Sequence, residues 1–296
     1  MMQIIDSHQH FWSIGMPGHQ WPTPDEGPIH RDFGPADLVA EADGIGLAGT
    51  ILVQSQPTDS DTDWMLALAR DNPMIKGVVG WVDLADPDAP RRIAELAQHR
   101  ELRGLRPMLQ SIENTDWLLQ DALRPALEAM QDHKLRFDAL IQPRHLPMLA
   151  RFVDRWPGLP VVIDHAAKPK AAAGLLDPWR TDIAALAARG VYCKLSGLRT
   201  EQASGQPAQD LLPYVAHLVA SFGDRLMWGS DWPVLHLSGD DYRRWYQDAD
   251  RLTGLRGAGR DRLFSGAARD FYGLDDDAVR RLGDRSEPTA QSSPDR

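Results

Sequence analysis

The segment Ile4-Ile5-Asp6-Ser7-His8-Gln9-His10 decides how this chain is interpreted. Two apolar residues lead into polar ones, and the two histidines are spaced i, i+2. Side chains alternate between the faces of a β-strand, so we expect Asp6, His8 and His10 to point the same way. Such a face suits the binding of a metal ion or a carbonyl oxygen. The alternative is an edge strand with solvated histidines. It is disfavoured because a second motif with candidate site residues lies near the other end of the chain.

Short β-rich runs alternate with helical patterns along the whole chain. The eight runs are Ile4–His8, Thr50–Gln54, Gly77–Asp83, Leu102–Pro107, Leu135–Ile141, Pro160–His165, Val191–Ser196 and Leu226–Asp231. The clearest helical patterns between them are Ala89–His99, Asp121–His133, Leu146–Arg155, Trp179–Arg189 and Leu211–Phe222. Strict β/α alternation predicts parallel strands joined by helical crossovers. Eight units in 296 residues predict a single-domain α/β fold, a (β/α)8 TIM barrel. An open doubly wound sheet is the alternative, but no Gly-x-Gly-x-x-Gly or phosphate-binding loop follows any run.

Two segments depart from this alternation. Phe11–Asp32 follows the first strand and is rich in proline, glycine and tryptophan. In a barrel such a long loop would lie over the face that carries the active site, although it could equally be a plain surface loop. Asp284–Arg296 is almost free of apolar residues and is expected to be a disordered tail, which leaves residues 1–283 for the barrel.

The composition excludes several classes of function. The net charge of -10 argues against nucleic-acid binding, which requires neutralisation of phosphates. The single cysteine, Cys193, cannot form an intramolecular disulfide. No apolar stretch approaches the ~20 residues that cross a bilayer, so we expect no membrane association and a cytoplasmic protein. A homo-oligomer is possible, and an exposed Trp245 would suit its interface.

Polar residues appear where the apolar strands stop, and two of them are informative. Asp231 lies in Trp228-Gly229-Ser230-Asp231-Trp232-Pro233, where flanking tryptophans would desolvate the carboxylate and raise its basicity. The alternative role for Asp231 is a helix N-cap. His165 ends the run Val161-Val162-Ile163-Asp164-His165 and is the third histidine expected at one rim.

Together these residues resemble the amidohydrolase superfamily (amidohydrolase 2 type), within the sugar-lactonase branch of L-fuconolactonase, L-rhamnono-lactonase and 2-pyrone-4,6-dicarboxylate lactonase. The matching stretches are Asp6–Trp12, Arg103–Pro107, Val162–Pro169, Cys193–Leu198 and Trp228–Pro233. They run in order from the first strand to the eighth, so the resemblance covers nearly the whole expected barrel.

The resemblance implies hydrolysis of a sugar (aldono) lactone, with an L-fuconolactone-like substrate favoured. It implies that Asp231 activates water while His8, His10 and His165 polarise the carbonyl. The expected substrate-binding residues are Arg106, Gln142, Trp232 and Trp21, with Asp138 a weaker candidate. Three further roles remain open: Arg106 as part of a structural ion pair, Lys194 as a structural partner of an aspartate, and Asp6 as an orienting acceptor for a histidine.

One departure from the family bears on metals. Many amidohydrolases hold two metals through strand 4 and strand 5, but strand 4 here offers Arg106, which repels cations. Strand 5 lacks a histidine, and His145 lies too far downstream to replace it. We therefore expect no cofactor, or one divalent metal such as zinc. The candidate ligands of a single metal are His8, His10, His165 and Asp231.

Other reactions remain as alternatives. A metal-dependent decarboxylase or hydratase acting on a small unsaturated carboxylic acid would share the His-x-His and Asp elements. Ser196 and Ser230 lack the Gly-x-Ser-x-Gly context of a serine nucleophile. A non-catalytic binding protein would not need three histidines and an aspartate at one rim. Substrate choice is expected to lie in loops such as Phe11–Asp32 and Thr200–Asp210.

Overall fold

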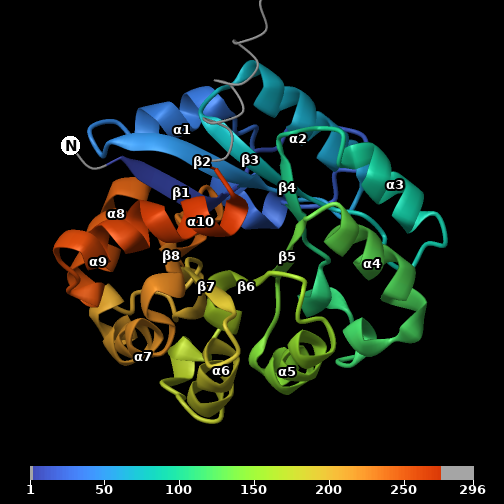
Figure 1. Cartoon of the computed structure of the whole chain (residues 1–296). Coiled ribbons are helices and arrows are strands. Elements are labelled where there is room, and N and C mark those ends of the chain that lie inside the picture. The colour runs from blue at the N-terminus through green and yellow to red at the C-terminus, as the bar shows by residue number, and fades with distance from the viewer. Residues whose placement is uncertain (1–2, 275–296) are drawn as a thin grey trace, which may run out of the picture.

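The computed structural model describes residues 3–274, which form a barrel of eight parallel strands in sequential order (Figure 1). The strands are β1 (Ile4–Gln9), β2 (Leu47–Val53), β3 (Ile75–Gly80), β4 (Leu102–Leu105), β5 (Arg136–Ala139), β6 (Val161–Ile163), β7 (Tyr192–Leu195) and β8 (Leu226–Trp228). The predicted (β/α)8 TIM barrel is thereby confirmed. Several strands stop before the predicted boundary, because the polar residue at the end leaves the ladder and turns toward the mouth of the barrel.

The barrel closes where β1 meets the segment after β8. Gln9 forms a parallel bridge with Trp232. The backbone N–H of His10 donates to the carbonyl of Trp232 at 2.8 Å, and the N–H of Asp231 donates to the carbonyl of His8 at 2.8 Å. Two motifs that lie more than 200 residues apart in the sequence are therefore joined by backbone hydrogen bonds.

Helices surround the sheet (Figure 1). They are α1 (Pro35–Glu41), α2 (Asp59–Asp71), α3 (Ala89–Leu96), α4 (Arg124–Asp132), α5 (Leu146–Arg155), α6 (Trp179–Ala187), α7 (Leu212–Phe222), α8 (Tyr242–Thr253), α9 (Gly257–Asp261) and α10 (Ala267–Tyr272). Capping residues in the sequence set where these helices begin and end. Thr58 Oγ1 caps α2 by accepting from the N–H of Asp61 at 3.2 Å, and left-handed Gly254 ends α8. The predicted helix Leu146–Arg155 is confirmed to the residue.

The core has two apolar layers. The inner layer fills the barrel and includes Ile5, Val53, Val79, Val162 and Met227. The outer layer lies between the strands and the helices. Burial of each large apolar side chain stabilises the folded state by roughly 1.5–3 kcal/mol. Apolar packing therefore holds the strands on both faces of the sheet. Toward the carboxyl ends of the strands the barrel interior becomes polar, which is where the candidate site lies.

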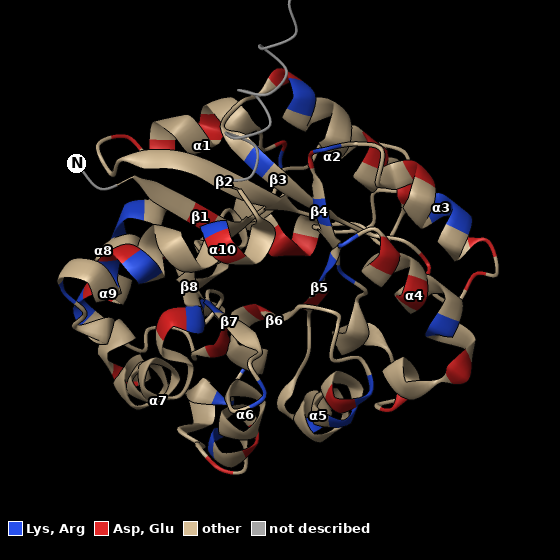
Figure 2. Cartoon of the chain, viewed as in Figure 1, with Lys and Arg blue, Asp and Glu red and all other residues tan. Residues whose placement is uncertain are grey.

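One tryptophan that was expected at the surface is buried. Trp245 is 1% exposed and its indole N–H donates to the carbonyl of Gly229, so the expectation of an exposed tryptophan was wrong. Its position in an amphipathic helix, α8, buries it. Acidic and basic residues are interspersed on the outer helices (Figure 2). Within residues 3–274 no helix is both long and apolar enough to cross a membrane. The predicted tail, Asp284–Arg296, lies outside the described residues.

Candidate active site

A cavity of ≈ 410 Å³ opens at the carboxyl ends of the strands. Its lining includes His10, Gln20, Trp21, Ser55, Gln56, Arg106, Gln110, His165, Lys168, Thr200 and Asp231. Residues from β1, β2, β4, β6 and β8, or from the loops that follow them, thus meet at one place. The loop Phe11–Asp32 reaches this cavity through Gln20 and Trp21.

Three imidazoles surround one carboxylate at the floor of this cavity. Asp231 Oδ1 lies 3.5 Å from His10 Nε2 and 3.7 Å from His8 Nε2. His165 Nε2 lies 3.8 Å from the same oxygen. The two histidines of β1 approach each other, with 3.2 Å between their Nε2 atoms. The structure therefore brings together the four residues that the sequence marked as catalytic, and all four are buried.

Hydrogen bonds on the far side of two rings set their orientation. His10 Nδ1 lies 2.8 Å from the carbonyl of Val53, which can only accept, so this nitrogen carries a proton. In the neutral ring Nε2, which faces Asp231, is then unprotonated. His165 Nδ1 lies 2.9 Å from Ser196 Oγ. Ser196 is fully buried behind the ring, which makes it a positioning partner of His165.

The backbone that presents His165 is a left-handed turn. Four consecutive residues without a glycine, His165 to Lys168, have φ between 49° and 59°. Left-handed geometry costs roughly 1–2 kcal/mol per residue and is retained only where the surroundings enforce it. One such contact is the indole N–H of Trp179, which donates to the carbonyl of Ala166 at 2.7 Å. Asp231 also has a positive φ, 56°, so two residues of the cluster depend on strained backbone.

Burial and charge oppose each other in this cluster. Burial by itself would raise the pKa of Asp231, but the facing imidazoles of His165, His10 and His8 outweigh it and hold that pKa below the usual carboxyl range. The expectation that flanking tryptophans raise its basicity was therefore wrong. Burial is also the largest influence on His165 and lowers its pKa to about 4. At neutral pH the Asp231 carboxylate is therefore ionised, whereas the rings of His8 and His165, whose pKa values burial lowers, are neutral.

A buried charged network lies directly behind His8. Lys194 Nζ lies 2.5 Å from Asp138 Oδ2 and 2.9 Å from Asp164 Oδ1, with all three side chains fully buried. The expected pairing of Lys194 with an aspartate is thereby confirmed. Tyr272 donates its O–H to Asp138 at 2.7 Å. Arg106 joins the network through Asp164 Oδ2 at 3.3 Å and also lines the cavity, so both of its predicted environments are present.

The predicted substrate-binding residues are divided among three places. Arg106 and Trp21 line the cavity that contains the histidines. Gln142 lines a neighbouring cavity of ≈ 780 Å³, and Lys168 borders both cavities. Trp232 is fully buried and packs edge-on against Phe33.

The sequence argument missed several residues of this cavity, and Gln56 and Lys168 are the two with the clearest contacts. Gln56 Oε1 accepts the backbone N–H of Gln20 at 2.8 Å, and Gln56 Nε2 donates to the carbonyl of Trp21, so this side chain fastens the long loop to β2. Lys168 pairs with Glu201 at 3.7 Å. The available signals were weak: Gln56 follows a strand by three residues, and Lys168 follows His165 by three.

Asp6 does not face the two histidines as the strand periodicity predicted. Its carboxylate accepts from the backbone N–H of Ser230 at 2.9 Å and from the O–H of Tyr242 at 3.0 Å. The pairing of β1 with β2 shifts register between Asp6 and Gln9, so the simple alternation breaks there. Asp6 fastens β1 to the segment after β8 and to α8, and within residues 3–274 its carboxylate accepts no hydrogen bond from a ring nitrogen of His8 or His10.

The donor set fits a single tetrahedral metal ion. One ligand atom each from His8, His10 and Asp231 lies within 4.8 Å of the others. Ligands placed about 2.1 Å from a tetrahedral centre are about 3.4 Å apart, close to the separations of 3.2, 3.5 and 3.7 Å found here. His145 does not extend the site, because its Nδ1 accepts the backbone N–H of Gln142 at 3.1 Å.

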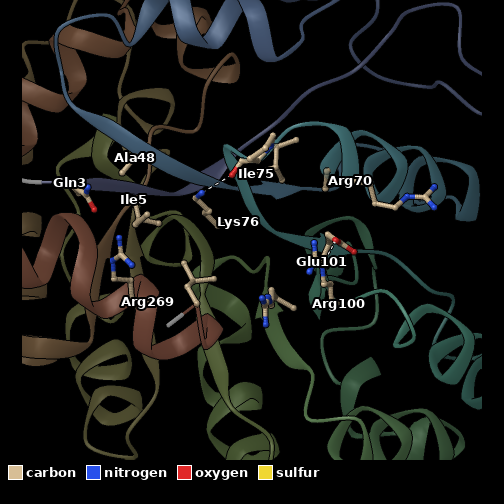
Figure 3. A pocket seen from close by; sticks show the side chains of 13 residues that line it. Gln3, Ile5, Ala48, Arg70, Ile75, Lys76, Arg100, Glu101 and Arg269 are labelled. Atoms are coloured by element: carbon tan, nitrogen blue, oxygen red, sulfur yellow. Dashed lines mark hydrogen bonds and ion pairs between the residues drawn. The ribbon is translucent and has the colours of Figure 1, made fainter. Parts of the chain in front are cut away.

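A further cavity of ≈ 570 Å³ lies at the opposite end of the barrel, against the first residues of the strands (Figure 3). Its lining includes Ile5, Ile75, Lys76, Arg100 and Arg269, and it contains no histidine. The imidazole–carboxylate cluster is therefore confined to the carboxyl end, where the active sites of such barrels lie.

Comparisons with known proteins agree with this geometry. The sequence model of the family described as Amidohydrolase matches residues 5–274. An L-fucono-1,5-lactonase of Burkholderia ambifaria is 46% identical over 282 residues, which cover 92% of this chain and 96% of the relative. An L-fucono-1,5-lactonase of Burkholderia multivorans is 35% identical over 94% of this chain and 98% of its own. A crystal structure of a Burkholderia multivorans amidohydrolase with bound zinc has a TM-score of 0.86 and 32% identity, and covers 92% of this chain and 99% of that one.

Proposed function

This chain belongs to the amidohydrolase family, and from that premise we propose that it hydrolyses an aldono-1,5-lactone, with L-fucono-1,5-lactone as the favoured substrate. The observation that carries the proposal is the convergence of three imidazoles on the Asp231 carboxylate at the floor of one cavity. Two lactonase relatives aligned over more than nine-tenths of this chain favour this reaction over decarboxylation or hydration.

Asp231 is the general base in this proposal. Its lowered pKa keeps it ionised at neutral pH, so it can accept a proton from a water molecule held against it. The water oxygen bonds to the lactone carbonyl carbon, and the bond from that carbon to the ring oxygen then breaks. Asp231 returns the proton to the departing ring oxygen, which becomes a hydroxyl group. The product is the open-chain aldonic acid.

The imidazoles stabilise the negative charge that develops on the carbonyl oxygen. His165 carries this role most directly, because it lines the cavity and its Nε2 faces the reacting region beside Asp231. For His165 to donate from Nε2, its Nδ1 must accept the O–H of Ser196, a contact of 2.9 Å. Removal of one preorganised donor of this kind costs roughly 3 kcal/mol, or about 100-fold in rate.

His8, His10 and Asp231 are the residues that would hold a single divalent ion such as zinc, with His165 adjacent. A zinc ion bound there would act as a Lewis acid on the lactone carbonyl. His10 is prepared for this, since the carbonyl of Val53 fixes the proton on Nδ1. Without the ion, His165 is left as the donor to the carbonyl oxygen, because the proton of His10 is on Nδ1 and faces the carbonyl of Val53.

The residues that line the cavity around the cluster bind the sugar in this proposal. Arg106 offers a fork of donors for lactone hydroxyl groups, and Trp21 offers an apolar face to the ring. Gln142 in the neighbouring cavity would contact only a substrate that extends past Lys168. Trp232 supports the site from behind through its contact with Phe33.

The test is acid release from a panel of aldonolactones, followed with a pH indicator before and after chelator treatment. Rapid hydrolysis of L-fucono-1,5-lactone by the wild type, lost in Asp231→Asn, is the expected result. Activity that survives chelation would assign carbonyl polarisation to the imidazoles alone, and activity restored by zinc would assign His8, His10 and Asp231 as ligands. Absence of hydrolysis across the whole panel would overturn the proposal.

A further inference from the structure

Two neighbours of His8 make incompatible demands on the proton of its ring. Lys194 Nζ lies 3.2 Å from His8 Nδ1, and an ammonium group can only donate. Asp164 Oδ1 lies 3.4 Å from the same nitrogen and can only accept when ionised. A neutral imidazole carries one ring proton, so Nδ1 can satisfy one of these neighbours and not both.

The Lys194 contact belongs to a complete chain of hydrogen bonds. If Lys194 donates to His8 Nδ1, the ring proton is on Nε2 and points at His10 Nε2, 3.2 Å away. His10 can accept it there, because its own proton is on Nδ1 and donates to the carbonyl of Val53. In this arrangement every ring nitrogen of the pair has a partner, but His8 Nε2 has no lone pair for a metal.

The Asp164 contact belongs to the metal-binding arrangement. If His8 Nδ1 donates to Asp164 Oδ1, then Nε2 is unprotonated and faces His10 and Asp231. Asp164 Oδ1 is a buried carboxylate oxygen that pairs with Lys194 Nζ at 2.9 Å, and the proton on His8 Nδ1 would give it a second donor. A carboxylate behind a ligating histidine is the usual support of a metal site.

A third contact bears on the balance between the two arrangements. Arg106 Nη1 lies 3.4 Å from His8 Nε2, which favours an unprotonated Nε2. The same guanidinium is already engaged by Asp164 Oδ2 at 3.3 Å and by the carbonyl of Gln54. The Lys194 contact to His8, at 3.2 Å, is the shorter of the two and comes from a side chain with no exposure to water.

We propose that Lys194 is a positioning residue that opposes metal binding by holding His8 in the Nε2–H tautomer, whereas Asp164 stabilises the Nδ1–H tautomer that binds metal. His8 remains neutral in both states, and only the location of its proton changes. Metal loading then requires His8 Nδ1 to exchange Lys194 for Asp164, while Lys194 keeps Asp138 and Asp164 as partners. This inference rests on the proposed place of His8 in the metal site, but not on the lactone as substrate.

The tautomer is measured directly by ¹⁵N NMR of protein labelled in histidine, using two-bond correlations that distinguish a protonated from an unprotonated ring nitrogen. We expect His8 to carry its proton on Nε2 in the metal-free protein and on Nδ1 after addition of zinc. The His8→Gln variant assigns the signals. A metal-free protein with the proton already on Nδ1 would overturn the proposal. No substrate is present, so this outcome is separate from any failure of lactone hydrolysis.

The second measurement is zinc affinity by competition with a chromophoric chelator. Asp164→Asn replaces the carboxylate behind His8 with a neutral amide, a weaker acceptor, and should weaken zinc binding by about 10- to 100-fold. Loss of the Lys194 donor should strengthen it by about tenfold. Lys194→Met with Asp138→Asn removes one positive and one negative charge together, which guards against an unpaired buried charge. Tyr272→Phe is the matched control. Tyr272 donates to Asp138 at 2.7 Å and is linked to His8 only through Asp138 and Lys194 in this network.

The zinc affinities of the three variants distinguish support for the proposal from its failure. Opposite shifts of affinity for the Asp164 and Lys194 variants, with Tyr272→Phe within about twofold of wild type, support the proposal. A loss of affinity in the Lys194 double variant equal to that of Asp164→Asn would mean that Lys194 supports the metal site, and would overturn it. Circular dichroism establishes that each variant is folded before affinity is compared.

Discussion

Gly197 supports the ring of His165, and replacing it with alanine should remove most of the activity. A Cβ on residue 197 would lie 2.5 Å from His165 Nδ1 and 2.6 Å from its Cγ. To restore an ordinary contact of 3.4 Å, the ring must retreat by about 0.9 Å. His165 has little space for this, because the His8 ring lies 4.4 Å away between centroids.

The expected loss follows from this displacement. A misplacement of about 1 Å at the reacting groups costs on the order of 100-fold in rate. The positive φ of Gly197, 63°, adds roughly 1–2 kcal/mol of backbone strain to the folded state of an alanine variant. We therefore expect Gly197→Ala to lower kcat/KM for L-fucono-1,5-lactone by about 100-fold and to lower Tm by a few degrees.

Gly254→Ala is the matched control for the strain alone. Gly254 has nearly the same φ, 62°, but a Cβ there meets no atom within 4 Å. The control should lose a similar part of its stability and keep its activity. The assay is kcat/KM by acid release together with Tm by calorimetry. If Gly197→Ala retained wild-type kcat/KM, or if both variants lost activity equally, the contact with His165 would not be what orients the ring.

Three other outcomes are expected. Asp231→Asn should lower kcat by about 100- to 10,000-fold. The fold should be retained, because asparagine tolerates the left-handed backbone of residue 231. Normal turnover in this variant would reject the assignment of Asp231 as the general base. Gln56→Ala should raise KM by about tenfold through release of the loop at Trp21, and an unchanged KM would show that the loop docks without it. Asp231 has a lowered pKa and the pKa of His165 is about 4, so both groups keep one protonation state from pH 8 to about pH 5 and kcat/KM should stay level over that range. A half-loss near pH 6.5 would contradict these protonation states.

The sequence was sufficient for the architecture because alternation of β and α segments is a local pattern that fits few folds. Eight such units without a dinucleotide- or phosphate-binding motif favoured the barrel over an open doubly wound sheet. The polar ends of the apolar strands also identified the rim, since parallel strands in a barrel deliver their carboxyl ends to the same face. His165 and Asp231 could be assigned to one site on that basis, although 66 residues separate them in the sequence.

The details of the cluster depended on contacts that no local pattern contains. Strand periodicity placed Asp6 with the histidines, but a register shift in the pairing of β1 with β2 turned it toward Tyr242. Flanking tryptophans suggested a more basic Asp231, whereas the opposing imidazoles arrive from two other strands and reverse the direction of the shift.

What the sequence determined by itself was the barrel and the identity of the groups at its mouth, because hydrophobic periodicity and strand order are properties of neighbouring residues. The tertiary structure alone decided the electrostatic state of those groups. The proton on His8 depends on Lys194, which lies 186 residues away, and on Asp164, which directly follows β6. Hydrogen bonds and charges act across space at a few ångströms, so their balance exists only after the barrel has closed.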